Sequence, residues 1–140
     1  MWECRSRSSL PALILMIAWA AAGASRTVWE GVYSAEQAGR GQKAYNAQCA
    51  RCHGEALLGG ETAPALVDRD FLETWEGNSV GSLVEAIRVT MPSDGPGKLS
   101  RQQAADIVAY LLKSNRFPDG KSDMATDIAA LNQIVFGAKP

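Results

Sequence analysis

Apolar and polar positions in the second half of the chain repeat with the period of a helix. Between residues 101 and 113 the apolar side chains recur at i, i+3, i+4, i+7 and i+8; they are Ala104, Ile107, Val108, Leu111 and Leu112. This spacing places them on one face that packs against a core. Ser100 and Gln103 have the spacing of a capping box, and Phe117-Pro118-Asp119-Gly120 follows as a stop. The pattern predicts a core-facing helix over residues 101–113.

A second helix is predicted between residue 34 and residue 49. Ser34 and Gln37 have capping-box spacing, and Ala38, Gly41 and Tyr45 follow at helical intervals. Glycine inside a helix costs about 1 kcal/mol relative to alanine. We therefore expect another backbone or a ring to approach Gly41 closely.

Two shorter helices are predicted between these. One is expected to begin with Asp68 as its cap and to end at Gly77; its apolar residues are Phe71, Leu72 and Trp75. The other is expected after a capping box of Ser82 and Glu85; its apolar residues are Leu83, Val84 and Ile87. It should end before Met91-Pro92, because a residue before proline avoids the helical region.

The remaining segments carry weaker patterns. Residues 54–64 and 93–97 are rich in glycine, proline and aspartate and are predicted to be loops. One short helix is expected around residues 128–134. Because no segment alternates as a half-buried strand does, the fold class predicted is all-α, with helices packed around a group that they cannot enclose alone.

The first 24 residues have the pattern of a secretory signal. Arg5 and Arg7 precede an apolar run from Leu10 to Ala22, and small residues follow it. We expect cleavage after Ala24 and a location in the periplasm. The alternative is an uncleaved anchor, which the short apolar run disfavours. The domains expected are a signal peptide (1–24), an extended lead-in (25–33), a core domain (34–117) and a C-terminal extension (118–140).

Composition narrows the chemistry of this single domain. Without residues 1–24 the chain has 12 basic and 14 acidic residues, so it carries no basic field and no nucleic-acid partner is expected. Its remaining cysteines and its histidine are Cys49, Cys52 and His53. The residue types that bind soft and borderline metals are therefore concentrated within five positions.

The segment Cys49-Ala50-Arg51-Cys52-His53 has the spacing C-x-x-C-H, which is the pattern of c-type haem attachment. Two intervening residues let one helical turn present both thiols to the haem vinyl groups. The histidine that follows can then bind iron. The motif therefore predicts one covalent haem c, joined at Cys49 and Cys52 with His53 as an iron ligand.

Three other uses of these residues fit the sequence less well. A structural zinc site needs four ligands, and two cysteines with one histidine do not supply them. A thioredoxin-like dithiol requires a βαβ setting that the sequence does not show. A structural disulfide suits an exported protein but leaves the adjacent histidine unexplained.

Met91 is the candidate for the second axial iron ligand. It follows a predicted helix, and Pro92 restricts the backbone beside it. A thioether ligand raises the reduction potential relative to a second nitrogen ligand. Methionine is more often a core-filling residue, and this is the role expected for Met124.

At residues 34–117 the chain resembles class I cytochromes c. Cys49-x-x-Cys52-His53 and Met91-Pro92 match the family's haem motif and axial methionine. Gly41 with Tyr45, and Ile107 with Tyr110, resemble the faces of its first and last helices. The resemblance implies a cytochrome c fold in which these helices cross near Gly41. It further implies that the Pro64 carbonyl accepts the His53 N–H, and that Trp75 reaches a haem propionate.

The lead-in and the tail add a second, broader resemblance, to small cytochromes associated with quinoprotein (PQQ) dehydrogenases. It implies redox partner proteins, among them a quinoprotein dehydrogenase and a terminal oxidase. The function expected is a periplasmic mono-haem electron carrier, not an enzyme, with no small-molecule substrate. The alternatives are a fixed cytochrome subunit of a dehydrogenase complex and a haem sensor or enzyme with an open iron position.

Overall fold

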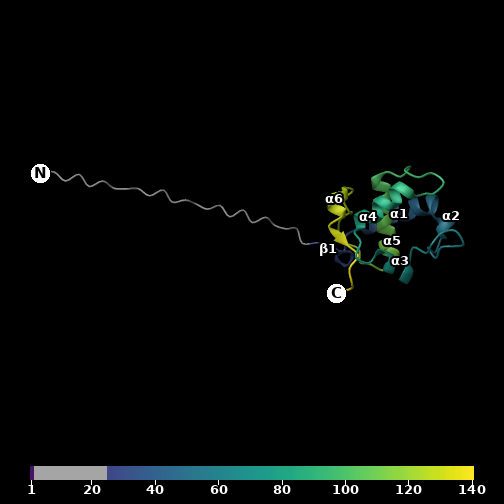
Figure 1. The fold of residues 1–140 in the computed structure, drawn as a ribbon, viewed down its shortest axis with the longest axis horizontal. Coiled ribbons are helices and arrows are strands. Elements are labelled where there is room, and N and C mark those ends of the chain that lie inside the picture. The colour runs from purple at the N-terminus through teal and green to yellow at the C-terminus, as the bar shows by residue number, and fades with distance from the viewer. Residues whose placement is uncertain (2–24) are drawn as a thin grey trace.

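The computed structural model describes Met1 and residues 25–140, so the expected signal peptide or anchor lies outside the described residues. The described chain is mostly helical (Figure 1). Its helices are α1 (Ala35–Gln48), α2 (Ala50–His53), α3 (Asp68–Trp75), α4 (Val80–Thr90), α5 (Arg101–Ser114) and α6 (Ile128–Leu131). Two short strands, β1 (Arg26–Thr27) and β2 (Ile134–Val135), accompany them. Within this part of the chain no helix is long and apolar enough to cross a membrane.

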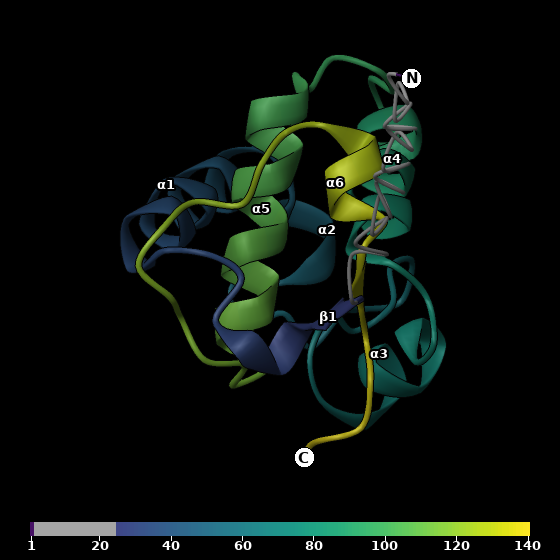
Figure 2. The same ribbon diagram turned by 90° about the vertical axis from the view of Figure 1, so that its left-hand side faces the viewer.

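Helix α5 forms the centre of the core, with α1 and α4 on either side of it (Figure 2). Its apolar stripe is buried as predicted: Ala104, Val108 and Leu112 are fully inaccessible to solvent. The Ser100–Gln103 capping box that begins α5 is present in both directions. Burial of this stripe accounts for the position of α5, because apolar area removed from water is the main favourable contribution to folding.

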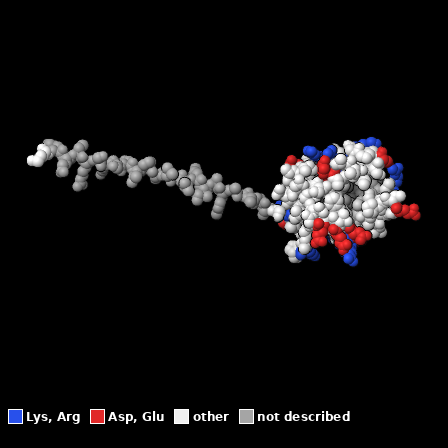
Figure 3. Space-filling model, in the orientation of Figure 1, with Lys and Arg blue, Asp and Glu red and all other residues white. Residues whose placement is uncertain are grey.

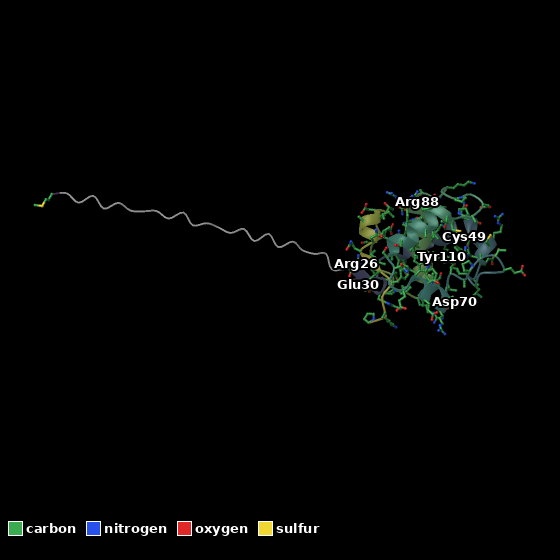
Figure 4. All side chains as sticks on the ribbon, in the orientation of Figure 1. Arg26, Glu30, Cys49, Asp70, Arg88 and Tyr110 are labelled. Carbon is green, nitrogen blue, oxygen red and sulfur yellow. The ribbon has the colours of Figure 1, made fainter. Side chains whose placement is uncertain are left out.

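Helices α1 and α5 cross at Gly41, as the resemblance implied. A Cβ atom at this position would lie 1.7 Å from the Asp106 carbonyl oxygen and 3.0 Å from the Tyr110 Cβ. The Tyr45 and Tyr110 rings pack beside the crossing with centroids 5.3 Å apart. Figure 4 shows Tyr110 near the middle of the folded part and Cys49 toward its α2 end. Only glycine lets the two backbones approach this closely.

We expect Gly41→Ala to lower the free energy of unfolding by about 1–3 kcal/mol, the usual range for overpacking. Gly39→Ala is the matched control, because a Cβ there meets no atom within 4 Å. In the same helix it should stabilise the protein by roughly 0.5–1 kcal/mol. Chemical denaturation of the two variants checks this, and equal stabilities would mean that the crossing is looser than described.

Two of the predicted helix starts are wrong in detail. The cap of α4 is Ser79, not Ser82, and its hydroxyl accepts the Ser82 N–H. Asp68 is the first residue of α3, and the cap position belongs to Val67. A cap needs an extended backbone, whereas Asp68 has φ 65° and its N–H donates to Asn115 Oδ1.

The capping box predicted for α1 forms in one direction only. Ser34 accepts the Gln37 N–H, but the fully buried Gln37 side chain accepts the Met124 N–H at 2.7 Å. The tail therefore donates to the side-chain oxygen that, in a full capping box, would accept the Ser34 N–H.

The lead-in and the tail form a small parallel sheet that the sequence did not predict. Arg26 pairs with Ile134 and Thr27 with Val135. The lead-in is also less extended than expected, because Val28–Glu30 form a 3₁₀ turn. The helix expected at 128–134 ends at Leu131 and is followed by β2. Strands of two residues are too short to show alternation, so no period-2 pattern could reveal them.

Aromatic rings join the sheet to the core. Phe136 follows β2 and lies 6.0 Å from Phe117 and 6.3 Å from Trp75, measured between ring centroids. The Trp29 ring lies 4.6 Å from Phe117, and its indole N–H donates to the Gly137 carbonyl. The lead-in and the tail are thus packed on the core.

Candidate haem-binding site

The C-x-x-C-H motif folds into one short helical turn. Cys49 ends α1, where its N–H donates to the Tyr45 carbonyl, and it also begins α2. The N–H groups of Cys52 and His53 both donate to the Cys49 carbonyl, at 3.1 and 3.0 Å. The Tyr45 hydroxyl donates to the Gly54 carbonyl at 2.7 Å and so holds the end of the turn. This local hydrogen bonding places both thiols and the imidazole beside one cavity.

The cavity has a volume of about 440 Å³, and its walls are mainly apolar. Cys49, Cys52 and His53 contribute from the α2 side, and Met91 contributes from the end of α4. The apolar wall residues come from the loop before α3 and from α3, α4 and α5; they are Leu66, Phe71, Leu83, Ile87, Ile107 and Leu111. Trp75 lines the same cavity, and the Phe136 ring packs against the Trp75 ring.

His53 is 7% exposed, and its ring is oriented by the backbone. Its Nδ1 lies 2.9 Å from the Pro64 carbonyl oxygen. A carbonyl only accepts, so Nδ1 carries the proton and Nε2 is left with a lone pair for a metal. The contact that the resemblance implied for Pro64 is therefore present, and such contacts fix the orientation of metal-binding imidazoles.

The loop that carries Pro64 depends on Gly59. The Gly59 N–H donates to the His53 carbonyl at 2.9 Å, and the φ angle of Gly59 is 75°. A Cβ atom there would lie 2.6 Å from both the Ala63 carbonyl oxygen and the Ala65 nitrogen. The sequence placed Gly59 within a predicted loop, residues 54–64, but did not identify it as a support for the Pro64 carbonyl.

The two candidate methionines lie in different surroundings. Met91 is the residue after α4; it donates its N–H to the Ile87 carbonyl at 2.9 Å and lines the cavity. Met124 is 4% exposed and belongs to the hydrophobic core. It is not among the residues that line the cavity. Met91, and not Met124, therefore lines the same cavity as Cys49, Cys52 and His53.

The electrostatics of the motif are unlike those of a redox dithiol. Burial, and to a smaller extent the neighbouring Cys52, raise the pKa of the Cys49 thiol to about 11. Redox-active cysteines have lowered pKa values, because the thiolate is the reactive form. Burial likewise raises the pKa of Tyr45 to about 12. These neutral groups suit a pocket for a large apolar ring.

Residues 36–111, more than half of the chain, match the sequence profile of the family described as cytochrome C oxidase, cbb3-type, subunit III. The chain belongs to this family of cytochrome c domains. Membership implies a covalent haem and electron transfer, and it agrees with the mostly helical fold. The sequence broadly resembles cytochromes c, and the profile match identifies the family more closely as that of the oxidase subunit.

One solved structure shares the fold of this cytochrome c domain: the crystal structure of the sulfane dehydrogenase SoxCD from Paracoccus pantotrophus. The TM-score is 0.51 at 20% sequence identity, over 94% of this chain and 66% of that chain. The present chain thus spans slightly less than two thirds of its structural relative. No curated protein sequence matches the chain.

All six residues predicted for the site line the cavity of this cytochrome c domain: Cys49, Cys52, His53, Pro64, Trp75 and Met91. The donor set and the apolar walls fit a covalent haem. Binding of the haem by each of these residues stays a prediction.

Sequence reasoning missed one residue that supports the wall of the cavity and one ion pair at its edge. Asn115, 9% exposed, donates to the Leu66 carbonyl and accepts the Asp68 N–H, so it positions the chain between the Pro64 loop and α3. Arg51 forms an ion pair with Asp94 at the edge of the cavity. Neither pairing has a signal in the sequence, because the partners are distant along the chain.

Proposed function

We propose that this protein is a mono-haem cytochrome that carries single electrons between redox proteins. The haem would be joined to Cys49 and Cys52, and its iron would be held by His53 and Met91. The observation that carries the proposal is the convergence of both thiols, an oriented imidazole and a thioether on one apolar cavity. When bound, haem supplies an iron that gains and loses one electron.

The residues of the chain would perform the remaining work. The Pro64 carbonyl holds the Nδ1 proton of His53 and so keeps Nε2 directed at the metal. Leu66, Leu83 and Ile107 keep water from the ring and lower the local dielectric, which tunes the potential. His53 is the chain's histidine. Once it binds iron, no imidazole remains for general acid–base chemistry, which favours a carrier over an enzyme.

The location and partners belong to the same proposal. The secretory pattern of residues 1–24 supports export to the periplasm with cleavage after Ala24. A periplasmic carrier would accept electrons from a dehydrogenase, for which a quinoprotein is our candidate, and pass them to a terminal oxidase. The face in Figure 3 shows acidic side chains gathered along its lower edge and no broad basic area, which is consistent with protein partners rather than nucleic acid.

A fixed cytochrome subunit is the second candidate, and the family description favours it because that description names a subunit of an oxidase. The lead-in and tail bury Val28 and Phe136 against the core, so these side chains cannot serve as docking surface. Co-purification with an oxidoreductase at stoichiometric yield would support the fixed subunit. Recovery of the monomer alone from the periplasmic fraction would support the carrier.

A potentiometric titration tests the function itself. The fraction of reduced haem should follow a one-electron Nernst curve as the potential is changed. The spectra of the oxidised and reduced forms should be the same whether the protein is titrated by reduction or by oxidation. The oxidised form should show the sulfur–iron band at the red end of the spectrum, because Met91 remains bound. Rapid carbon monoxide binding by the untreated reduced protein would contradict the proposal and favour an open-site sensor or enzyme.

A further inference from the structure

An ion pair connects the two sides of the cavity at its edge. Arg51 lies between the two cysteines of the motif, and Asp94 lies three residues after Met91. The Arg51 Nη2 and the Asp94 Oδ2 are 2.5 Å apart, and both residues line the cavity. The pair therefore links the turn expected to hold the haem with the segment expected to hold the opposite face of the iron.

The segment after Met91 has few other attachments. Residues 92–98 contain one internal hydrogen bond, from the Gly95 N–H to the Pro92 carbonyl. At either end the segment is anchored by the last turn of α4 and by the buried Leu99. Among the described residues, the pair of Arg51 and Asp94 is the one hydrogen bond or ion pair that joins residues 92–98 to another element. Its loss would leave this segment without a hydrogen bond or ion pair to another element.

We propose that the Arg51–Asp94 pair is a latch that keeps Met91 in place. It holds the segment after Met91 against the haem-attachment turn, so that the thioether leaves the iron less often. Arg51 and Asp94 are positioning residues that act through Met91 and do not touch the reacting atoms. The inference rests on the proposed function, because it presupposes that Met91 binds the iron.

The expected size of the effect follows from the exposure of the pair. The Arg51 side chain is 77% exposed and that of Asp94 is 59% exposed. Exposed ion pairs contribute little, and the loss of one changes an equilibrium by about two- to five-fold at most. The latch therefore biases the segment toward the closed position without locking it, and salt should weaken it.

The test measures the rate at which carbon monoxide binds the reduced, haem-loaded protein. Carbon monoxide is neutral, so the field of a nearby charge does not attract or repel it. Both Arg51→Gln and Asp94→Asn should bind it about two- to five-fold faster than wild type at low salt. The two changes shift the net charge in opposite directions, so a change in the field at the iron would move the two variants apart.

Two further proteins sharpen the test. Arg69→Gln removes a comparable exposed pair, Arg69–Glu73 at 2.5 Å with 83% and 59% exposure, and should bind carbon monoxide as wild type does. The exchanged protein Arg51→Asp/Asp94→Arg restores opposite charges across the edge and should return to the wild-type rate. Failure of the exchange to restore the rate would overturn the latch.

Met91→Ala separates failure of the latch from failure of the proposed function. If wild type binds carbon monoxide as fast as Met91→Ala, Met91 is not a ligand and the proposed function fails. If Met91→Ala is faster but Arg51→Gln and Asp94→Asn match wild type, the function stands and the latch is wrong. Opposite changes in the two latch variants would also overturn it. The sulfur–iron band of each oxidised protein gives a second readout. It reports the bond between Met91 and the iron, and a change in the stability of the fold alone would not alter it.

Discussion

Serine at both position 49 and position 52 should leave the chain with no covalently bound haem. Both sulfurs lie on one turn beside the cavity, and a hydroxyl does not form the thioether that a thiol forms with a vinyl group. The wild-type protein, produced together with cytochrome c maturation enzymes, should keep one haem through denaturation. Mass spectrometry of the denatured proteins measures the difference, which is the mass of one haem.

Cys4→Ser is the matched control for this experiment. It makes the same chemical change at the third cysteine, which lies outside the described residues and before the expected cleavage site. It should leave haem attachment intact. A wild-type mass equal to that of the bare chain would refute the haem assignment, and haem retained by the double variant would refute the role of the two thiols.

Met91→Ala should open one face of the iron while leaving the haem attached. Loss of the thioether should lower the reduction potential, because methionine ligation raises it. Carbon monoxide should then bind at least about ten-fold faster, the factor that corresponds to roughly 1.4 kcal/mol of activation free energy. The sulfur–iron band should disappear from the oxidised spectrum. Stopped-flow mixing and a redox titration measure these changes.

Met124→Ala distinguishes an iron ligand from a buried methionine. Met124 is 4% exposed within the core, so its truncation should lower the free energy of unfolding by about 2–5 kcal/mol. The spectrum and the rate of carbon monoxide binding should stay as in wild type. A variant of Met124 that loses the sulfur–iron band would mean that the roles of the two methionines are reversed.

The parts of the fold that the sequence predicted well are those where local and tertiary preferences agree. The helix at residues 101–113 has an apolar stripe, a capping box and a stop signal, and α5 shows all three. Gly41 was unfavourable for its own helix, and this mismatch correctly indicated the close crossing with α5. The candidate site could be predicted for a similar reason, because Cys49, Cys52 and His53 form one local sequence motif.

The start of α4 was predicted wrongly because two serines near it carry the same capping signal. Ser79 and Ser82 can both cap, but Gly81 packs against Asn132, where a Cβ atom would lie 2.2 Å from Oδ1. This contact with the tail extends the helix to an earlier start. The ion pair of Arg51 and Asp94 was equally hidden from sequence analysis, because it exists only once two distant segments meet.

The parallel pairing of β1 with β2 has a consequence for the order of folding. The Trp29 indole and its Gly137 acceptor are 108 residues apart in the sequence. Contacts of such separation form slowly, because the chain loses its closure entropy before the contact stabilises it. The turn at residues 49–53 closes over four residues and has no such delay. Phe136 packs against Trp75, which lines the cavity, so we expect this wall to become fully packed only after the last part of the chain has docked.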